Sequence, residues 1–229
     1  KPRISWRLTS DERAVVQSAY RIQVAADSGF EQLIWDSGKQ LSDHNVHVEL
    51  AELPVQSRSR YHYRVQVWND RDEASDWSSP SWWETGMLDQ AQWTADWISA
   101  PHALTAAEPD RSPMLRKSFV LEGGVREARI YATSLGIYEL FLNGHRVGDM
   151  YFTPGWTSYK HRLQYQTYDV TSLLQQGDNV IGGWMGKGWY MGNLGWKDQN
   201  NIFGDRMALL VQMHVKMEDG SEFVAVQSD

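Results

Sequence analysis

The chain has 229 residues, of which 41% are hydrophobic and 22% are charged, the composition of a globular protein with one or two domains. A net charge of −7 without a cluster of Lys and Arg argues against nucleic acid or an anionic membrane as a partner. The absence of Cys excludes disulfides and thiolate metal ligands and leaves the cellular compartment open. No apolar run approaches the roughly 18 residues of a membrane span, and residues 1–6 do not have the pattern of a signal peptide.

Residues 1–88 alternate between apolar and polar side chains, which is the pattern of half-buried strands. The alternating segments cover residues 20–24, 46–50 and 61–67. Short turn signals such as Asp36-Ser-Gly38 separate them. No helical stripe competes with this pattern, so the residues predict an antiparallel β-sandwich.

Part of this first unit resembles the final strands of fibronectin type III modules. The resemblance lies in Leu53-Pro54, in Tyr61-His-Tyr-Arg-Val-Gln-Val-Trp-Asn69 and in Asp76-Trp-Ser-Ser-Pro80. Related sandwiches contain a tyrosine whose hydroxyl ties a strand to the preceding corner. We expect Tyr61 to have this structural role.

Residues 89–113 have the composition of a linker, rich in Ala, Pro and Asp. A spacer of this length without regular structure is usually held against a folded unit. The aromatic residues within it, Trp93 and Trp97, are expected to pack between the two units.

Residues 114–229 predict a second all-β unit, a jelly-roll-like sandwich. Asn143-Gly144 between apolar residues predicts a type I′ hairpin. Residues 171–176 predict one helical turn, with Asp169 or Thr171 as its cap and Gly177 as its stop. Residues 207–217 alternate cleanly and turn at Asp219-Gly220 into a last strand. We count six or seven strands where a jelly roll has about eight, so we expect this domain to be incomplete at its C-terminus.

Aromatic residues are the candidate ligand-binding groups, because the chain contains 12 Trp, 10 Tyr and 6 Phe. Trp most often fills a core, but sugar rings also stack on it. The run Gly182-Gly-Trp-Met-Gly-Lys-Gly188 lacks the ending of a phosphate loop, and its glycines are expected to allow close backbone approach beside Trp rings. The loop 184–205 offers the following candidate substrate-binding residues: Trp184, Trp189, Tyr190, Trp196 and Asp198.

Five motifs in order resemble the N-terminal portion of bacterial α-L-rhamnosidases, and the resemblance covers essentially the whole chain. The first motif is Trp93-Thr-Ala-Asp-Trp-Ile98, which follows the type III-like module. The others are Leu140-Phe-Leu-Asn-Gly-His-Arg-Val-Gly-Asp149, Thr153-Pro-Gly-Trp-Thr-Ser-Tyr159, Tyr165-Gln-Thr-Tyr-Asp-Val-Thr171 and Gly186-Lys-Gly-Trp-Tyr190. Each motif is weak alone, but their order is specific.

The resemblance implies an inverting glycoside hydrolase that removes terminal α-L-rhamnose from glycosides or polysaccharides. Its chemistry would be carried by acidic residues in a C-terminal (α/α)6 barrel of the same polypeptide, because inversion needs two carboxyl groups roughly 6.5–9.5 Å apart. We assign no catalytic residue to this chain, because its acidic residues sit beside turns and at strand ends. Its seven His show no zinc-binding spacing, so no metal or cofactor is expected.

Three functions follow from these observations. The first is a pair of accessory domains that buttress the catalytic barrel and shape its substrate entrance. The second is a carbohydrate-binding module that uses the Trp-rich loop 184–205. The third is an adhesion or spacer protein built from β modules. The position of Trp189 and Trp196, exposed on a platform or buried in the sandwich, discriminates between binding and packing.

Overall fold

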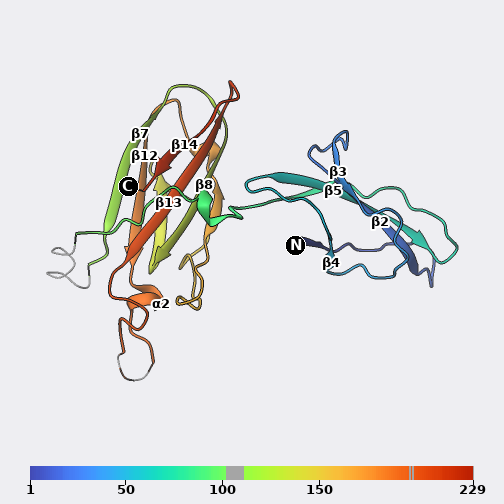
Figure 1. The fold of residues 1–229 in the computed structure, drawn as a ribbon, viewed down its shortest axis with the longest axis horizontal. Coiled ribbons are helices and arrows are strands. Elements are labelled where there is room, and N and C mark those ends of the chain that lie inside the picture. Colours follow the sequence, from blue (N-terminus) through green and yellow to red (C-terminus); the bar gives the residue numbers. More distant parts are fainter. Residues whose placement is uncertain (102–110, 196, 198, 229) are drawn as a thin grey trace. The chain divides into compact units, whose positions relative to one another are not determined.

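A computed structural model describes residues 1–101, 111–195, 197 and 199–228 of the chain. It divides into two compact units, Lys1–Asp89 and Gln90–Asp229, both built from antiparallel strands (Figure 1). In the described residues no helix is long and apolar enough to cross a membrane. Apart from short helical turns, both units are built of β-strands in the described residues, as the alternating sequence patterns predict.

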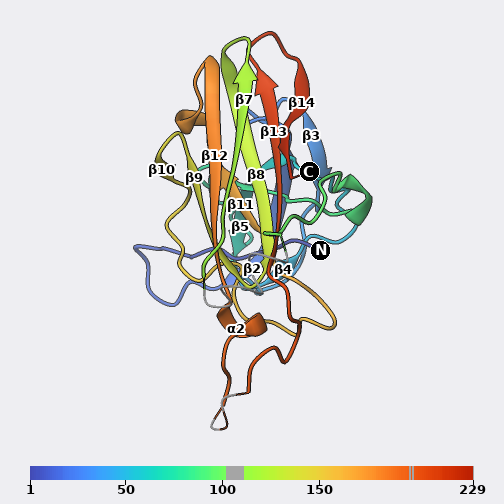
Figure 2. The ribbon, with the colours of Figure 1, turned by 90° about the vertical axis from the view of Figure 1, so that its left-hand side faces the viewer.

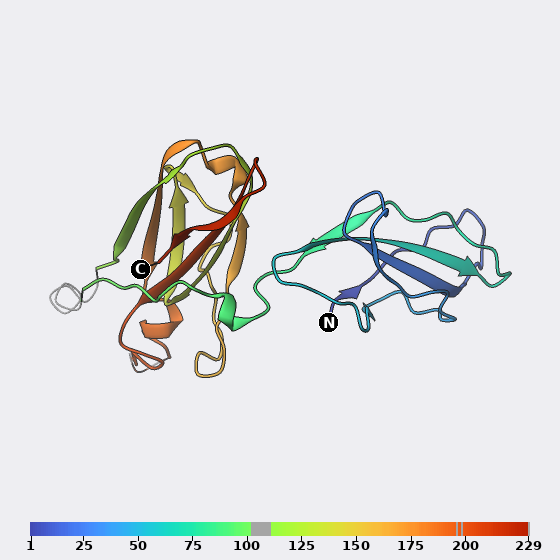
Figure 3. The ribbon, with the colours of Figure 1, turned by 45° about the horizontal axis from the view of Figure 1, so that its top comes forward.

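Unit 1 contains a four-stranded and a two-stranded sheet, with strand orders β3-β2-β5-β6 and β1-β4. Long strands β2 and β5 run side by side at the centre of the larger sheet (Figure 3). The side chains of Ile22, Val24 and Val65 on these two strands are buried in the core. The strands are β1 (Arg3–Ile4), β2 (Gln17–Ala25), β3 (Leu33–Asp36), β4 (Val48–Glu49), β5 (Arg60–Asn69) and β6 (Ser81–Glu84).

The tyrosine corner of unit 1 is confirmed, whereas one predicted strand is shorter than expected. The Tyr61 hydroxyl accepts a hydrogen bond of 2.6 Å from the backbone N–H of Gln56, at the corner that precedes β5. The predicted strand 46–50 is reduced to β4, and Val46 is exposed. His47 explains this difference, because its positive φ of 52° breaks the extended conformation just before β4.

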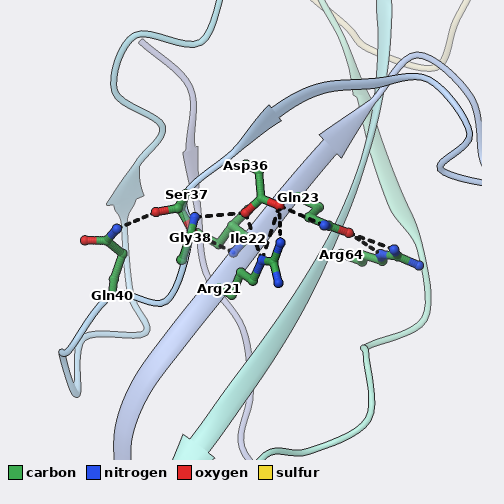
Figure 4. A network of polar contacts seen from close by, with 8 residues as sticks. All are labelled: Arg21, Ile22, Gln23, Asp36, Ser37, Gly38, Gln40 and Arg64. Atoms are coloured by element: carbon green, nitrogen blue, oxygen red, sulfur yellow. Dashed lines mark hydrogen bonds and ion pairs between the residues drawn. The ribbon is translucent and has the colours of Figure 1, made fainter.

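A polar network centred on Asp36 ties β3 to β2 (Figure 4). Arg21 donates to the carboxylate through Nε, at 2.9 Å, and through Nη2, at 2.6 Å. Gln23 and the backbone N–H of Gly38 donate at 2.8 Å each. Gln23 in turn accepts two hydrogen bonds from Arg64 of β5, so the network spans three strands. The turn motif Asp36-Ser-Gly38 therefore supplies an anchor as well as a turn.

Unit 2 is a sandwich of two four-stranded sheets, ordered β10-β9-β12-β7 and β11-β8-β13-β14 (Figure 2). Its described residues form eight strands, so the expected count of six or seven was too low, because the Gly-rich strand β12 was not predicted as a strand. The strands are β7 (Met114–Leu121), β8 (Val125–Leu135), β9 (Ile137–Leu142), β10 (His145–Arg146), β11 (Gln166–Asp169), β12 (Gly177–Gly186), β13 (Ala208–Met217) and β14 (Glu222–Gln227).

Two predicted turns of unit 2 are confirmed and one is shifted. Asn143 and Gly144 have φ values of 50° and 83° between β9 and β10, as a type I′ turn requires. Gly220, at a φ of 89°, turns β13 into β14. The helical turn is a 3-10 helix, η2 (Thr171–Leu173), which ends at Leu174 in extended conformation. Gly177 is thus the first residue of β12, not the stop of this turn.

The linker begins with a 3-10 helix, η1 (Gln90–Gln92), and then lies against the outer face of β13. The side-chain oxygen of Gln212 accepts hydrogen bonds from the backbone N–H groups of Thr94 and Ala95, at 2.8 and 3.1 Å. Further along, Ile98 forms an antiparallel bridge with Leu209. Trp93 packs edge-on against Tyr165, with ring centroids 5.4 Å apart. These contacts place the segment 93–98 on unit 2.

The Asp36 network predicts a pH-dependent contribution to the stability of unit 1. The hydrogen bonds from Arg21 and then from Gln23 and Gly38 lower the pKa of Asp36 to about 2. Its stabilisation is therefore fully present above the ordinary carboxyl pKa and is lost as the pH falls through about 2. We expect Asp36→Asn to lower the free energy of unfolding by about 1–2 kcal/mol at pH 7, since the pair is partly exposed.

Urea denaturation of both proteins at pH 7, 5, 4, 3 and 2 measures this effect, and the difference should shrink below pH 4. The exposed Asp43, changed to Asn, is the matched control and should leave stability unchanged. A constant difference at every pH would show that the Asp36 charge is not the source of the stabilisation.

Candidate functional site

The sequence predicted that the Gly- and Trp-rich run 182–188 belongs to a loop. In the structure this run is mainly the end of strand β12. β12 lies between β9 and β7 and pairs with both along most of its length. Ile181 and Met185 point into the core, while Trp184 points outward. The run therefore carries the alternation of a strand, and glycine hides it because it occupies both inward and outward positions.

The glycines of β12 do allow close approach, but to aliphatic side chains and not to Trp rings. A Cβ atom at the inward Gly183 would lie 2.7 Å from Leu209 Cδ2 and 3.5 Å from Leu140 Cδ2. Leu209 belongs to β13 of the opposite sheet, so Gly183 sets how closely the two sheets pack. At the outward Gly182, by contrast, an added Cβ would meet only the carbonyl oxygen of Leu115, at an ordinary 3.7 Å.

Trp184 lies on the outer face of the sheet β10-β9-β12-β7, with 46% of its surface exposed. Its ring meets that of Phe141 edge-on, with centroids 6.1 Å apart. Beside these rings the missing side chain of Gly182 leaves a shallow groove of about 400 Å³. We call this hollow the β12 groove, and its lining includes Met114, Arg116, Phe141, Val180, Gly182 and Trp184.

Trp189 and Tyr190 lie elsewhere, on the short helix α2 (Gly188–Met191) at one end of the unit 2 sandwich (Figures 1 and 2). The Trp189 ring stacks on Trp156 at an interplanar angle of 8°, with centroids 6.1 Å apart. Phe152 approaches it edge-on. Trp156 and Phe152 are exposed, at 58% and 63%, so this aromatic cluster lies at the surface.

Tyr190 belongs to a second aromatic cluster, in which Tyr159 contacts both Tyr190 and Phe203. Tyr159 meets Tyr190 edge-on at 5.3 Å and Phe203 at 5.0 Å between centroids. Burial raises the pKa of both tyrosines, and for Tyr190 the nearby Asp205 raises it further. Both phenols therefore stay protonated at neutral pH and act as packing and hydrogen-bonding groups.

The sequence prediction brought together residues that the structure separates. Trp184 belongs to the sheet face, whereas Trp189 and Tyr190 belong to the end of the sandwich. Trp196 and Asp198 lie outside the described residues. Trp156, the stacking partner of Trp189, was missed as a site residue, although its motif Thr153-Pro-Gly-Trp-Thr-Ser-Tyr159 marks the family resemblance.

A buried hydrogen-bond network positions the segment that carries Trp156. The backbone of Tyr138 in β9 pairs with Thr153, whose hydroxyl also donates to the Tyr138 carbonyl at 2.7 Å. The Tyr138 hydroxyl lies 2.9 Å from Gln166 Oε1 and 3.0 Å from the Tyr168 hydroxyl. Burial raises the pKa of Tyr138, which keeps this phenol neutral. The turn after Thr153 is therefore fixed to the core of the sandwich.

A second hollow of about 640 Å³ opens between the two sheets of unit 2. Aliphatic core residues such as Leu115, Leu140 and Ile181 line it, together with Lys117 and Arg206. Both hollows of this unit are thus lined mainly by apolar side chains with one or more basic residues. In the part of the chain that the structure describes, no group of three His, Asp or Glu could hold a metal ion.

Both units match families of known proteins. Residues 1–89 match the model of the Rha78A-like, N-terminal immunoglobulin domain, and residues 123–229 match that of the α-L-rhamnosidase N-terminal domain. The chain belongs to the N-terminal domains of the α-L-rhamnosidases. These enzymes are glycoside hydrolases, and the match confirms the resemblance drawn from the five ordered motifs.

The relatives are much longer than this chain. An α-L-rhamnosidase of Formosa agariphila is 36% identical over 100% of the chain, which spans only 26% of that relative. The structure of an α-L-rhamnosidase from Streptomyces avermitilis complexed with L-rhamnose superposes with a TM-score of 0.91 at 26% identity, and the chain covers 38% of it. For the α-L-rhamnosidase from Aspergillus terreus the TM-score is 0.83 at 34% identity, with 26% of that chain covered.

The glycine pair of this rhamnosidase N-terminal domain gives a test of β12. Gly183→Ala forces a Cβ atom against Leu209, so we expect it to lower the free energy of unfolding by about 1–3 kcal/mol. Gly182→Ala has room and restricts the unfolded chain, so it should be neutral or stabilise by up to about 1 kcal/mol. Thermal and urea unfolding measure both, and equal effects of the two variants would contradict this assignment of faces.

Proposed function

We propose that this chain is a non-catalytic N-terminal part of an α-L-rhamnosidase that hydrolyses terminal α-L-rhamnose from glycosides or polysaccharides. Residues 1–88 and 114–229 are the two accessory domains, and residues 89–113 connect them. They buttress a C-terminal (α/α)6 catalytic barrel and shape its substrate entrance. The observation that carries the proposal is that relatives named α-L-rhamnosidase match the chain along its whole length but extend far beyond it.

The electrostatics of the described carboxylates support an accessory role. An inverting glycosidase needs a general acid whose pKa is raised, facing a carboxylate base across the substrate. The carboxylates with a shifted pKa, such as Asp27, Asp36 and Asp219, are shifted downward by hydrogen bonds or nearby cations. Such groups stay ionised and serve as structural anchors of turns and strands.

The placement of the aromatic residues also favours support over direct sugar binding. The carbohydrate-binding alternative needs the Trp rings of the loop 184–205 on one platform. Trp184 lies on the outer face of β12, while Trp189 has Trp156 stacked on it and Phe152 at its edge. Trp189 and Tyr190 therefore act first as packing groups that hold α2 on the sandwich.

The proposal predicts that the purified chain does not hydrolyse an aryl α-L-rhamnoside, because it lacks the barrel that supplies the acid and the base. The whole parent polypeptide should hydrolyse the same substrate. Release of the coloured phenol measures both. Turnover by the chain alone, persisting after repeated purification, would refute the accessory role, and an inactive parent polypeptide would refute the family activity.

Packing of the Trp rings further predicts that free rhamnose leaves the Trp fluorescence of the chain unchanged up to high millimolar concentration. Trp156→Ala serves as the comparison, because it uncovers the stacked face of Trp189 and should alter the spectrum without sugar. A saturable response that is present in the natural chain and lost in Trp156→Ala would favour the carbohydrate-binding module instead.

A further inference from the structure

The two sheets of unit 2 differ in how their outer faces are covered. On the sheet β11-β8-β13-β14, the outward pair Tyr131 and Gln212 is almost fully buried. The linker covers this pair. Gln212 donates a hydrogen bond to the carbonyl of Gln92 at 2.9 Å and accepts one from the backbone N–H of Thr94. Trp93 packs on Tyr165, which in turn contacts Tyr131. This outer face is therefore covered by the linker of the same chain.

The opposite sheet, β10-β9-β12-β7, has an outer face of similar chemistry that carries no such layer in the described residues. On β12 the outward residues are Asp178, Val180, Gly182, Trp184 and Gly186, while the inward ones are also mainly apolar. A strand that is apolar on both faces is typical of a sheet covered on both sides. A sheet with one solvated face normally alternates apolar and polar residues instead. The sequence of β12 is thus that of a covered strand.

The neighbouring strands extend this apolar surface around the β12 groove. Phe141 and Arg116 flank Gly182 in the register, and Met114 is the partner of Trp184. Met114 is 69% exposed, so the apolar surface continues from Trp184 onto β7. The hollow over Gly182 is thus walled by Phe141, Trp184 and Met114, and Arg116 also belongs to its lining.

A charged pair continues the surface toward the end of the sandwich. Glu139 is the register partner of Trp184, and its carboxylate lies 3.4 Å from Arg146 Nη2. Arg146 also donates to the carbonyl of Met150 at 2.6 Å and lies over the ring of Tyr151. Arg146 is therefore already paired, whereas Arg116, the cation of the groove, forms no ion pair among the described residues.

We propose that this outer face is a docking surface for another part of the same polypeptide, with an apolar side chain in the β12 groove and a carboxylate against Arg116. The inference rests on the proposed function, since it identifies the surface through which these domains buttress the rest of the enzyme. The relatives support an intramolecular occupant, because 74% of the Formosa agariphila relative lies outside the part that this chain spans (100 − 26).

The chemistry of the groove distinguishes a polypeptide from a sugar. A pyranose ring buried in a pocket needs hydrogen-bond partners for several hydroxyl groups. The walls of the β12 groove are mainly Met, Val, Leu, Phe, Trp and Gly, and its side-chain donors are the guanidinium of Arg116 and the indole N–H of Trp184, with no side-chain acceptor in the lining. An apolar side chain with one neighbouring carboxylate satisfies this surface, whereas a sugar would leave most of its hydroxyls unpaired.

Thiol footprinting tests the proposal, because the chain contains no Cys of its own. Met114→Cys places one thiol at the groove. The rate at which this thiol reacts with a maleimide is measured by mass spectrometry of the labelled peptide. The rate is divided by that of the same variant unfolded in urea. We expect this rate to be at least about tenfold lower in the parent polypeptide than in the 229-residue chain. A rate within about threefold in the two proteins would overturn the proposal.

Filling the groove provides the second variant. Gly182→Leu has room for its Cβ atom and points the rest of its side chain into the open β12 groove, so the melting temperature of the isolated chain should stay the same or rise, which separates the test from misfolding. When Gly182→Leu is combined with Met114→Cys in the parent polypeptide, the Leu side chain should block docking. The labelling rate of the thiol should then equal that in the isolated chain. Thr167→Leu, which places the same Leu side chain at an exposed position of β11, is the control and should preserve protection. Protection that survives Gly182→Leu would show that the groove is not the contact.

Two other occupants give distinct results that would also overturn the proposal. A second copy of the chain would protect Met114→Cys in the isolated protein at high concentration, together with a dimer mass in size-exclusion chromatography with light scattering. Rhamnose or a rhamnoside would protect it when added to the isolated chain. Hydrolysis of an aryl rhamnoside by the parent polypeptide is scored separately, so a wrong family activity and a wrong docking surface are distinguishable.

Discussion

The close approach of the two sheets at Gly183 is the constraint on which unit 2 depends. β12 is an interior strand of its sheet, and the missing side chain at Gly183 lets Leu209 and Leu140 meet over its backbone. Protein interiors are packed as densely as organic crystals, so one additional methyl group at this position must displace a neighbour. The spacing of the sheets sets the positions of the core residues on β9 and β13, and through them the loops at both ends.

From this core the structure builds outward in layers. Tyr138 of β9 fixes the turn after Thr153, and that turn presents Trp156 to Trp189 on α2. On the other sheet, Gln212 of β13 organises the linker by accepting from and donating to its backbone. Each layer is positioned by polar contacts at its base and by aromatic contacts at its surface. In unit 2, aromatic contacts thus join α2 and the linker to the sandwich.

Sequence patterns predict the strands of this protein well where side chains differ between the two faces of a sheet. Residues 207–217 alternate because one face fills the core, and Asn143-Gly144 predicts its turn because few residues accept two positive φ values. The pattern fails at β12, where glycine stands on both faces and removes the alternation. It also fails to pair Trp189 with Trp156, because their contact joins segments that are distant in the chain and depends on the Tyr138 network.

The failure at β12 bears directly on function. A Gly- and Trp-rich run resembles a binding loop when it is taken as irregular, but in a strand the same residues divide between a packed inner face and an apolar outer face. Gly183 then serves the core, and Gly182 opens a groove beside Trp184. Exposed apolar strand surfaces are costly for a protein in water and are normally covered. In an accessory domain, contact with a neighbouring domain would remove this apolar face from water and so lower its free energy, while the same contact holds the neighbouring domain in place.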